Sequence, residues 1–312
     1  MPFCPANVKA MNILIVGGAG MIGGYSALYM RSHGHNVTLA GRHPVENVPI
    51  LEDLPFLKGD YIAGDYTLEI LAEFDTILFA AGADPRHVPH GYPADEFYLL
   101  SCKAVIAFAQ LARDAGVKRF VYIGSFYLHV APDLVATTPY VRSRKLAADG
   151  VTSLAGPDFH VCSLDAPFVV GSVPGMNVPM FVAYTQYAEG KFEIPPFAPT
   201  GGTNFISVQS LTEAISAALD HNHSQAISGR AMLVGDENLT FSQYFGLFFH
   251  AVGNDIVVPA LEREHPLLPD SALWTGRKVV AYEPDAQDAA LLGYRRHDVQ
   301  NAVENIVAEY RS

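Results

Sequence analysis

Cysteine is scarce in this sequence, which has only Cys4, Cys102 and Cys162 among 312 residues. The three residues form neither a Cys-x-x-Cys pair nor a Cys/His spacing typical of metal sites, so we expect no metal centre. A sparse, odd-numbered set also argues against a disulfide framework. It is typical of proteins in a reducing cytoplasm, where we expect this chain to reside.

Positive charge and long apolar segments are scarce as well. Lys and Arg number 20 against 32 Asp and Glu, which gives a net charge of −12. Because nucleic-acid binding needs a basic surface, we expect no nucleic-acid partner. No apolar run approaches the ~20 residues that cross a bilayer, so we expect no membrane span.

Apolar residues make up 50% of the chain and are spread along it, which excludes a disordered or fibrous protein. In the first half, short apolar runs typical of buried strands alternate with helical patterns. This alternation predicts right-handed βαβ crossovers and an α/β fold with a doubly wound parallel sheet. Strands are expected at 12–16, 36–40, 61–63, 76–80, 119–123 and 160–164, and the main helices at 21–33, 95–115 and 140–154.

A glycine-rich turn separates the first expected strand from the first expected helix. Gly17 permits a tight turn, Gly20 lets backbone amides approach a ligand, and Gly23 allows close helix–sheet packing. A helix start also offers free N–H groups and a positive dipole, which favour a pyrophosphate. A dinucleotide is therefore expected to contact Gly17, Ala19, Gly20, Met21, Ile22 and Gly23.

The Gly-x-x-Gly-x-x-Gly spacing resembles that of the extended short-chain dehydrogenase/reductase family, including its nucleotide-sugar epimerase and dehydratase branch. The resemblance covers nearly the whole chain and implies a Rossmann domain that binds NAD(P). Gly64-Asp65 resembles the adenine-contacting Asp that follows the family's third strand. Ala80-Ala81-Gly82 resembles the small-residue segment over which the cofactor passes. The resemblance thus adds Asp65, Ala80, Ala81 and Gly82 to the expected cofactor site.

The end of the second strand indicates which cofactor is bound. An acidic residue there binds the ribose hydroxyl of NAD, whereas an arginine can accept the 2′-phosphate of NADP. The sequence reads Leu39-Ala40-Gly41-Arg42-His43 and contains no acidic residue at this point. Arg42 offers a planar, permanently charged group suited to phosphate. We therefore expect NADP(H), with NAD(H) as the alternative.

The family's chemistry uses a Ser, a Tyr and a Lys one helical turn after the Tyr. Ser125 follows the fifth expected strand, at the carboxyl edge where doubly wound folds bind ligands. Tyr140 lies at the start of a helix, but its i+4 position holds Arg144, and Lys145 lies ~140° away around the helix. By resemblance, Tyr140 is the acid–base group, Ser125 holds the substrate oxygen, and Arg144 gives electrostatic support and contacts the cofactor with Tyr140.

Beyond Asp165, several prolines break the regular pattern. Pro167-Phe168-Val169-Val170-Gly171 resembles the family's loop after the sixth strand, which implies cofactor contacts from Pro167, Phe168 and Val170. We predict a dinucleotide-binding Rossmann domain formed by residues 11–165 and 203–222. Residues 166–202 and 223–312 are predicted to form a smaller C-terminal, substrate-binding portion.

These features favour an NADP-dependent oxidoreductase that interconverts an aldehyde or ketone and an alcohol by hydride transfer. The aromatic region after Asp165 suggests an apolar carbonyl substrate. The long helices expected at 95–115 and 140–154 could pair two copies in a homodimer, as they do in the family.

Two other functions stay open. One is a nucleotide-sugar epimerase or dehydratase with tightly held NAD(P). Its diphosphate needs cations, and only Lys191 lies between Asp165 and Gly229, although later arginines keep this alternative open. The arginines that keep the nucleotide-sugar alternative open are Arg263, Arg277, Arg295 and Arg296.

The other function is that of a non-catalytic NADP-binding sensor, which the altered Tyr-x-x-x-Arg motif would explain.

Overall fold

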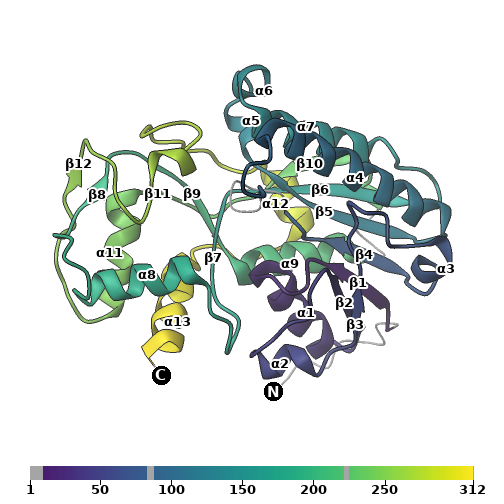
Figure 1. The fold of residues 1–312 in the computed structure, drawn as a ribbon, viewed down its shortest axis with the longest axis horizontal. Helices are drawn as coiled ribbons and strands as arrows, with labels where there is room; N and C mark the ends of the chain where they lie inside the picture. Colours follow the sequence, from purple (N-terminus) through teal and green to yellow (C-terminus); the bar gives the residue numbers. More distant parts are fainter. Residues whose placement is uncertain (1–9, 83–87, 221–224, 312) are drawn as a thin grey trace.

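The apolar strands of the chain assemble into one seven-stranded sheet, in the order β10-β6-β5-β4-β1-β2-β3 (Figure 1). All of its strand pairs are parallel, so the predicted α/β fold with a parallel sheet is confirmed. The computed structural model describes residues 10–82, 88–220 and 225–311. The strands are β1 (Asn12–Val16), β2 (Asn36–Gly41), β3 (Phe56–Lys58), β4 (Thr76–Phe79), β5 (Arg119–Ser125), β6 (His160–Ala166) and β10 (Arg230–Leu233).

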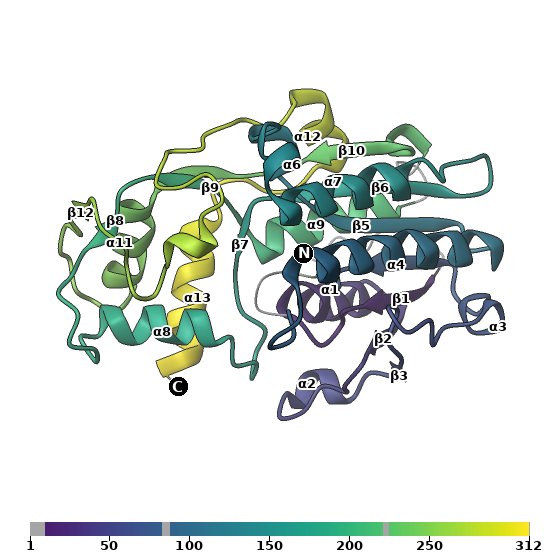
Figure 2. The same ribbon diagram turned by 45° about the horizontal axis from the view of Figure 1, so that its top comes forward.

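Helices cover both faces of this sheet (Figures 1 and 2). Successive side chains of a strand point to opposite faces, so Ile13 and Ile15 enter one core while Leu14 and Val16 enter the other. Both faces of β1 are therefore buried, which explains why it reads as a continuous apolar run. The first core lies under α1 (Met21–Ser32), α9 (Val208–Leu219) and α12 (Ala286–Leu292), and the second under α4 (Ala94–Asp114) and α7 (Pro139–Thr152).

The third strand differs from the prediction, because β3 lies at Phe56–Lys58 and residues 61–64 form a turn. The Asp60 carboxylate closes this turn by accepting a hydrogen bond from the Ile62 N–H at 2.8 Å, and the Gly64 N–H donates to the Asp60 carbonyl at 3.1 Å. The apolar residues 61–63 resemble a strand in sequence, but these hydrogen bonds bend the backbone there.

A second unit is built from the chain after β6. Three of its strands form a separate sheet in the order β11-β9-β7, and three helices pack against one another beside it (Figure 1). The core of this unit is rich in aromatic side chains, several of them fully buried. Its elements are β7 (Phe168–Val170), α8 (Pro179–Ala188), β9 (Gly202–Ser207), β11 (Glu237–Thr240), α11 (Phe241–Ala251) and α13 (Val299–Arg311).

The boundary between the two units differs from the predicted one. Strand β10 lies within the range assigned to the substrate-binding portion, yet it pairs with β6 at the edge of the central sheet. Helix α12 likewise packs against α9, which covers one face of the central sheet. The remaining short elements are α2 (Pro49–Glu52), α3 (Leu68–Leu71), α5 (Tyr127–Val130), α6 (Leu134–Thr137), β8 (Ala198–Pro199), β12 (Ala260–Leu261) and η2 (Asp270–Ala272).

Two of the three cysteines, Cys102 and Cys162, are buried free thiols, and Cys4 lies outside the described residues. Within the described part of the chain, no helix combines the length and apolar character that a membrane crossing requires.

A buried histidine in the second unit makes the stability of the protein depend on pH. His265 is fully buried against the rings of Tyr187, Phe197 and Phe245, and burial, aided by Arg263, lowers its pKa from 6.5 to about 4. Between these two values the unfolded chain binds a proton that the folded chain does not, so stability falls as pH falls.

We predict that lowering the pH from 7 to 5 destabilises the wild type by about 2 kcal/mol more than His265→Leu, measured by urea unfolding at both values. His250→Gln, at an exposed histidine, is the control and should retain the wild-type slope. Equal slopes for wild type and His265→Leu would contradict the prediction.

Candidate active site

The glycine turn after β1 is so closely packed that Gly17 and Gly23 have no room for a side chain against the backbone. Gly17 has φ +85°, and its N–H donates to the Ala40 carbonyl at 2.9 Å. A Cβ at Gly17 would lie 2.6 Å from the backbone nitrogen of Ala81, and one at Gly23 would lie 2.4 Å from the Gly17 carbonyl oxygen. Gly17 therefore lets the turn pack against the end of β4. Gly23 lets α1 pack against the turn itself, rather than against the sheet as we expected.

The start of α1 is open to an anion. Gly20 is its N-cap residue, no side chain in the described part of the chain caps the helix, and its first turn holds no acidic residue. A Cβ at Gly20 would approach only the Gly17 carbonyl oxygen, at 3.4 Å. The helix N–H groups are thus left for a ligand, and this arrangement fits the pyrophosphate of a dinucleotide. Ala19 lies in the turn, and Met21 and Ile22 are the first two residues of α1.

Two further parts of the expected cofactor site lie at the same edge of the sheet. Ala80, Ala81 and Gly82 directly follow β4 beside the glycine turn. Arg42 directly follows β2, is exposed, and forms no ion pair with another described residue.

Asp65 does not occupy the place predicted for it. It lies in the turn after β3, where its carboxylate accepts a hydrogen bond from the Asp60 N–H at 2.8 Å. The residue that follows the third strand is Asp60, within Gly59-Asp60. Two Gly-Asp pairs lie close together in this region, and the strand expected at 61–63 pointed to the second one.

The segment after β6 also differs from its prediction. Phe168 and Val170 belong to strand β7, which pairs with β9, so this segment is not a loop. Val170 is fully buried in the aromatic core, and the Phe168 ring contacts Phe205 and Tyr244. Burial therefore removes Val170 from the set of cofactor contacts and directs Phe168 largely into the core. Pro167 is buried between β6 and β7.

The expected catalytic residues lie on neighbouring elements. Ser125 ends β5 at the carboxyl edge of the sheet and is 5% exposed. Tyr140 and Arg144 lie one turn apart on α7, which packs against β5. Lys145 points elsewhere, because its ammonium group pairs with Asp149 at 2.7 Å. The expected direction of Lys145 is thus confirmed.

Arg144 is directed into the protein. Its guanidinium donates from Nη2 to the Ile123 carbonyl at 2.6 Å and lies 5.2 Å from the centroid of the Tyr122 ring. Its Nε is buried and has no hydrogen-bond partner among the described residues. Burial opposes the charge, but the nearby Tyr122, Tyr140 and Asp165 raise the pKa of Arg144 overall. A permanent positive charge therefore lies behind Tyr140.

A buried acid that was not among the predicted site residues lies beside Ser125. Asp165, near the end of β6, is fully buried and lies 2.7 Å from Nε2 of His129 on α5. Ser163 donates to its other oxygen at 2.6 Å. A Cβ at Gly124 would overlap this carboxylate, so glycine is needed next to Ser125. An acidic residue closing an apolar strand was the available signal, but its partner lies 36 residues away.

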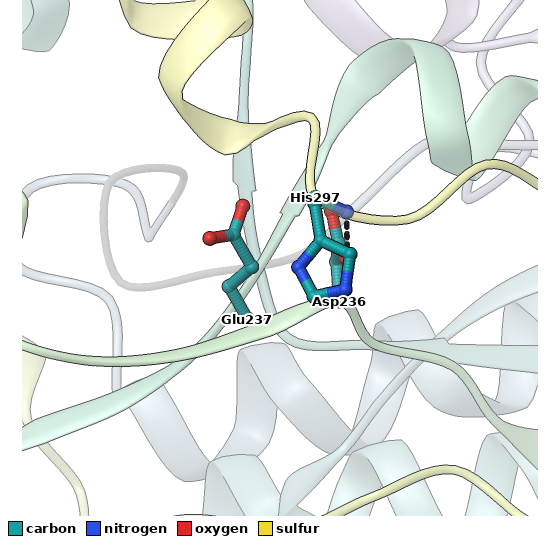
Figure 3. Close-up of side chains that lie close together, drawn as sticks. All are labelled: Asp236, Glu237 and His297. Atoms are coloured by element: carbon teal, nitrogen blue, oxygen red, sulfur yellow. Dashed lines mark hydrogen bonds between the residues drawn. The ribbon is translucent and has the colours of Figure 1, made fainter.

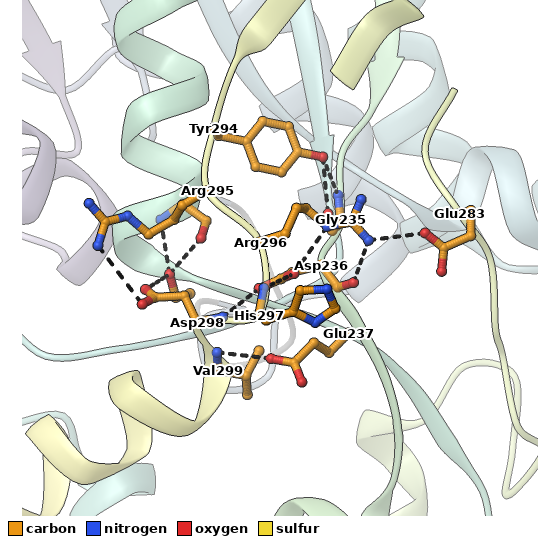
Figure 4. A network of polar contacts seen from close by, with 12 residues as sticks. Gly235, Asp236, Glu237, Glu283, Tyr294, Arg295, Arg296, His297, Asp298 and Val299 are labelled. Atoms are coloured by element: carbon orange, nitrogen blue, oxygen red, sulfur yellow. Dashed lines mark hydrogen bonds and ion pairs between the residues drawn. The ribbon is translucent and has the colours of Figure 1, made fainter. Parts of the chain in front are cut away.

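Asp236, Glu237 and His297 also lie close together, with one potential ligand atom of each within 4.8 Å of the others (Figure 3). Asp236 accepts hydrogen bonds from Arg296 Nε at 3.0 Å and from the His297 N–H at 2.6 Å (Figure 4). Glu237 accepts one from the N–H of Val299, the first residue of α13. These bonds explain the cluster as an anchor for the start of α13.

Most of the arginines that could hold a diphosphate already have partners. Arg277 pairs with Asp270, Arg295 with Glu213, and Arg296 with Asp236 and Glu283. The Arg263 guanidinium lies 4.0 Å from the centroid of the Phe197 ring. A phosphate ligand would have to compete with these contacts.

The sequence matches one known protein family over most of its length. The family described as the NAD dependent epimerase/dehydratase family matches residues 13–235, which is more than half of the sequence. The chain belongs to the NAD-dependent epimerase/dehydratase family. The predicted resemblance to the extended short-chain dehydrogenase/reductase enzymes is thereby confirmed.

Individual relatives within this family are distant. UDP-glucose 4-epimerase of Corynebacterium glutamicum is 26% identical over 161 residues, which are 51% of this chain and 48% of that protein. The match therefore spans about half the length of that relative. UDP-glucose 4-epimerase of Erwinia amylovora is 24% identical over 253 residues, which are 68% of this chain and 74% of that protein.

A solved structure shows the same fold. UDP-glucose-4-epimerase from Stenotrophomonas maltophila, with bound NAD and formylated UDP-arabinopyranose, superposes with a TM-score of 0.77 at 21% identity. The superposition covers 96% of this chain and 98% of that one. The fold is thus that of this family's epimerases.

The glycine turn can be tested with a matched pair of variants. Gly17 and Gly34 both have positive φ, but a Cβ at Gly34 would contact no described residue within 4 Å. Both alanine variants suffer the same backbone strain, whereas only Gly17→Ala adds a clash with β4. We predict that Gly17→Ala is about 1–3 kcal/mol less stable than Gly34→Ala and binds dinucleotide at least tenfold more weakly. Thermal unfolding and calorimetry measure both effects, and equal behaviour of the two variants would contradict the prediction.

Proposed function

We propose that this protein is an epimerase or dehydratase that uses a bound nicotinamide dinucleotide to oxidise a sugar hydroxyl transiently. The observation that carries the proposal is the family match over residues 13–235, which includes the glycine turn, Ser125 and Tyr140. It favours the alternative drawn from the sequence over the carbonyl reductase with an apolar substrate. The curated relatives are UDP-glucose 4-epimerases, which supports a sugar as the reacting group.

Each of the three predicted catalytic residues has its own role in this reaction. When bound, the nicotinamide supplies a hydride acceptor that can also return the hydride. Tyr140 takes the proton of the substrate hydroxyl and gives it back, and Ser125 holds the oxygen by hydrogen bonding. Arg144 supports the Tyr140 oxygen by its charge from behind, since its guanidinium is engaged by the Ile123 carbonyl.

The diphosphate of a nucleotide sugar would be held by a different set of groups. Arg263, which forms no ion pair with another described residue, is the cation most easily recruited. Arg277, Arg295 and Arg296 would have to leave or share a carboxylate partner. Because these cations are engaged, sugars with and without a nucleoside diphosphate are both candidate substrates.

The predicted homodimer also remains a proposal. Helices α4 and α7 pack against each other and expose Leu99, Leu100 and Leu146 to solvent, each by more than 40%. Exposed apolar side chains on two adjacent helices support their use as an interface.

Turnover by the purified protein tests the proposed function. UDP-sugars and the matching free sugars are incubated with NAD or NADP, and the products are followed by proton NMR. We expect conversion by the wild type and a loss of at least a hundredfold in Tyr140→Phe, because the acid–base group is removed. Cofactor binding should be retained in that variant. Unchanged turnover in Tyr140→Phe, or no conversion of any sugar by cofactor-loaded wild type, would contradict the proposal.

Arg42 offers a separate test of cofactor choice. We propose that its exposed guanidinium contacts the 2′-phosphate of NADP, although the structural relative contains NAD. Arg42→Ala should then lower the affinity for NADP about tenfold and leave that for NAD unchanged, as measured by calorimetry. Arg113→Ala, which removes a surface charge on α4, is the control. Equal losses for both cofactors would remove Arg42 from this role.

A further inference from the structure

A tryptophan from the C-terminal part of the chain covers Tyr140. Trp274 is the single tryptophan of the sequence. Its indole stacks on the Tyr140 ring, with the centroids 5.2 Å apart and the planes at 13°. Tyr98 of α4 makes a second contact with the same ring, edge to face at 5.5 Å. The phenol is therefore held between α7, α4 and a segment far along the chain.

The segment that carries Trp274 is closed on itself. Arg277 donates to both carboxylate oxygens of Asp270, at 2.9 and 2.6 Å. Between them, the Gly276 N–H donates to the Leu273 carbonyl at 2.8 Å. Residues 270–277 thus form a short clip with Trp274 near its middle.

The clip is fixed to β9 of the second unit. Gly202 exchanges backbone hydrogen bonds with Lys278 and Val280, at 3.2 and 3.0 Å. Gly201 has φ +101°, and a Cβ there would lie 2.6 Å from the Arg277 backbone. The Trp274 backbone also interacts with the Tyr127 hydroxyl on α5. The clip therefore connects the C-terminal unit to α5, which follows Ser125, and to α7, which carries Tyr140.

Such a contact matters for proton transfer. The Tyr140 oxygen must reach the substrate hydroxyl with a heavy-atom distance near 3 Å. A displacement of about 1 Å can cost on the order of a hundredfold in rate. Stacking restricts both the tilt and the rotation of the phenol ring, because aromatic pairs prefer defined geometries.

We propose that Trp274 is a positioning residue for Tyr140, and that through it the C-terminal unit sets the geometry of proton transfer. This inference rests on the proposed function, in which Tyr140 moves the substrate proton. Trp274 is partly exposed and belongs to none of the three buried cores. This incomplete burial argues against a purely structural role.

The kinetic test compares Trp274→Ala with Trp274→Phe in the cofactor-loaded protein. We expect Trp274→Ala to lower kcat by ten- to a hundredfold while KM changes less than threefold. Trp274→Phe keeps a ring on Tyr140 and should recover kcat to within about threefold of wild type. Arg277→Gln opens the clip without touching the indole, and it should lower kcat by an intermediate factor. Unchanged kcat in Trp274→Ala, or equal losses in the Ala and Phe variants, would overturn the positioning role.

A spectroscopic test does not depend on turnover. All tryptophan emission comes from Trp274, so Tyr140→Leu should shift its emission maximum or lifetime, whereas Tyr29→Leu on α1 should not. Emission that is unchanged in Tyr140→Leu overturns the proposal directly. A wild type that binds cofactor but converts no substrate contradicts the proposed function, and the positioning role falls with it. An active wild type whose rate ignores Trp274→Ala overturns the positioning role alone.

Discussion

The close contact between the Gly17 turn and the end of β4 is the constraint on which the site depends. The turn can lie against Ala81 only because Gly17 has no side chain, and its amide is held by the carbonyl of Ala40 on β2. Parallel register ends β1, β2 and β4 at one level, so α1 begins directly over the sheet edge. The backbone groups that fit a pyrophosphate and the side chain of Ser125 are thereby presented on the same edge.

The arginine at position 144 donates hydrogen bonds in other directions than a lysine at this position would. A guanidinium is planar and donates in fixed directions, and here one of these directions meets the Ile123 carbonyl. The charge is placed among Tyr122, Tyr61 and Asp165, behind Tyr140. The Arg144 charge can act on Tyr140 through its electric field. Near Ser125, the buried Asp165 is hydrogen-bonded to His129.

The C-terminal unit is tied to the half that contains the central sheet by polar and backbone contacts. Asp236 accepts hydrogen bonds from Arg296 and from the backbone just before α13, next to β10 of the central sheet. Gly201 and Gly202 bring the Trp274 segment against β9. Arg277, Arg295 and Arg296 of this unit already pair with carboxylates, which distinguishes its surface from one with free cations for a diphosphate.

The sequence by itself determined the parallel sheet, the glycine turn, the positions of Ser125 and Tyr140 and the outward direction of Lys145, because these follow from local periodicity and spacing. Tertiary structure decided the rest. The third strand was misplaced because side-chain hydrogen bonds of Asp60, not apolar content, bend residues 61–64. The pairing of β10 with β6, the burial of Val170 and the stacking of Trp274 on Tyr140 join segments far apart in the chain. Contacts of this kind leave no local pattern, since they depend on which surfaces the folded sheet brings together.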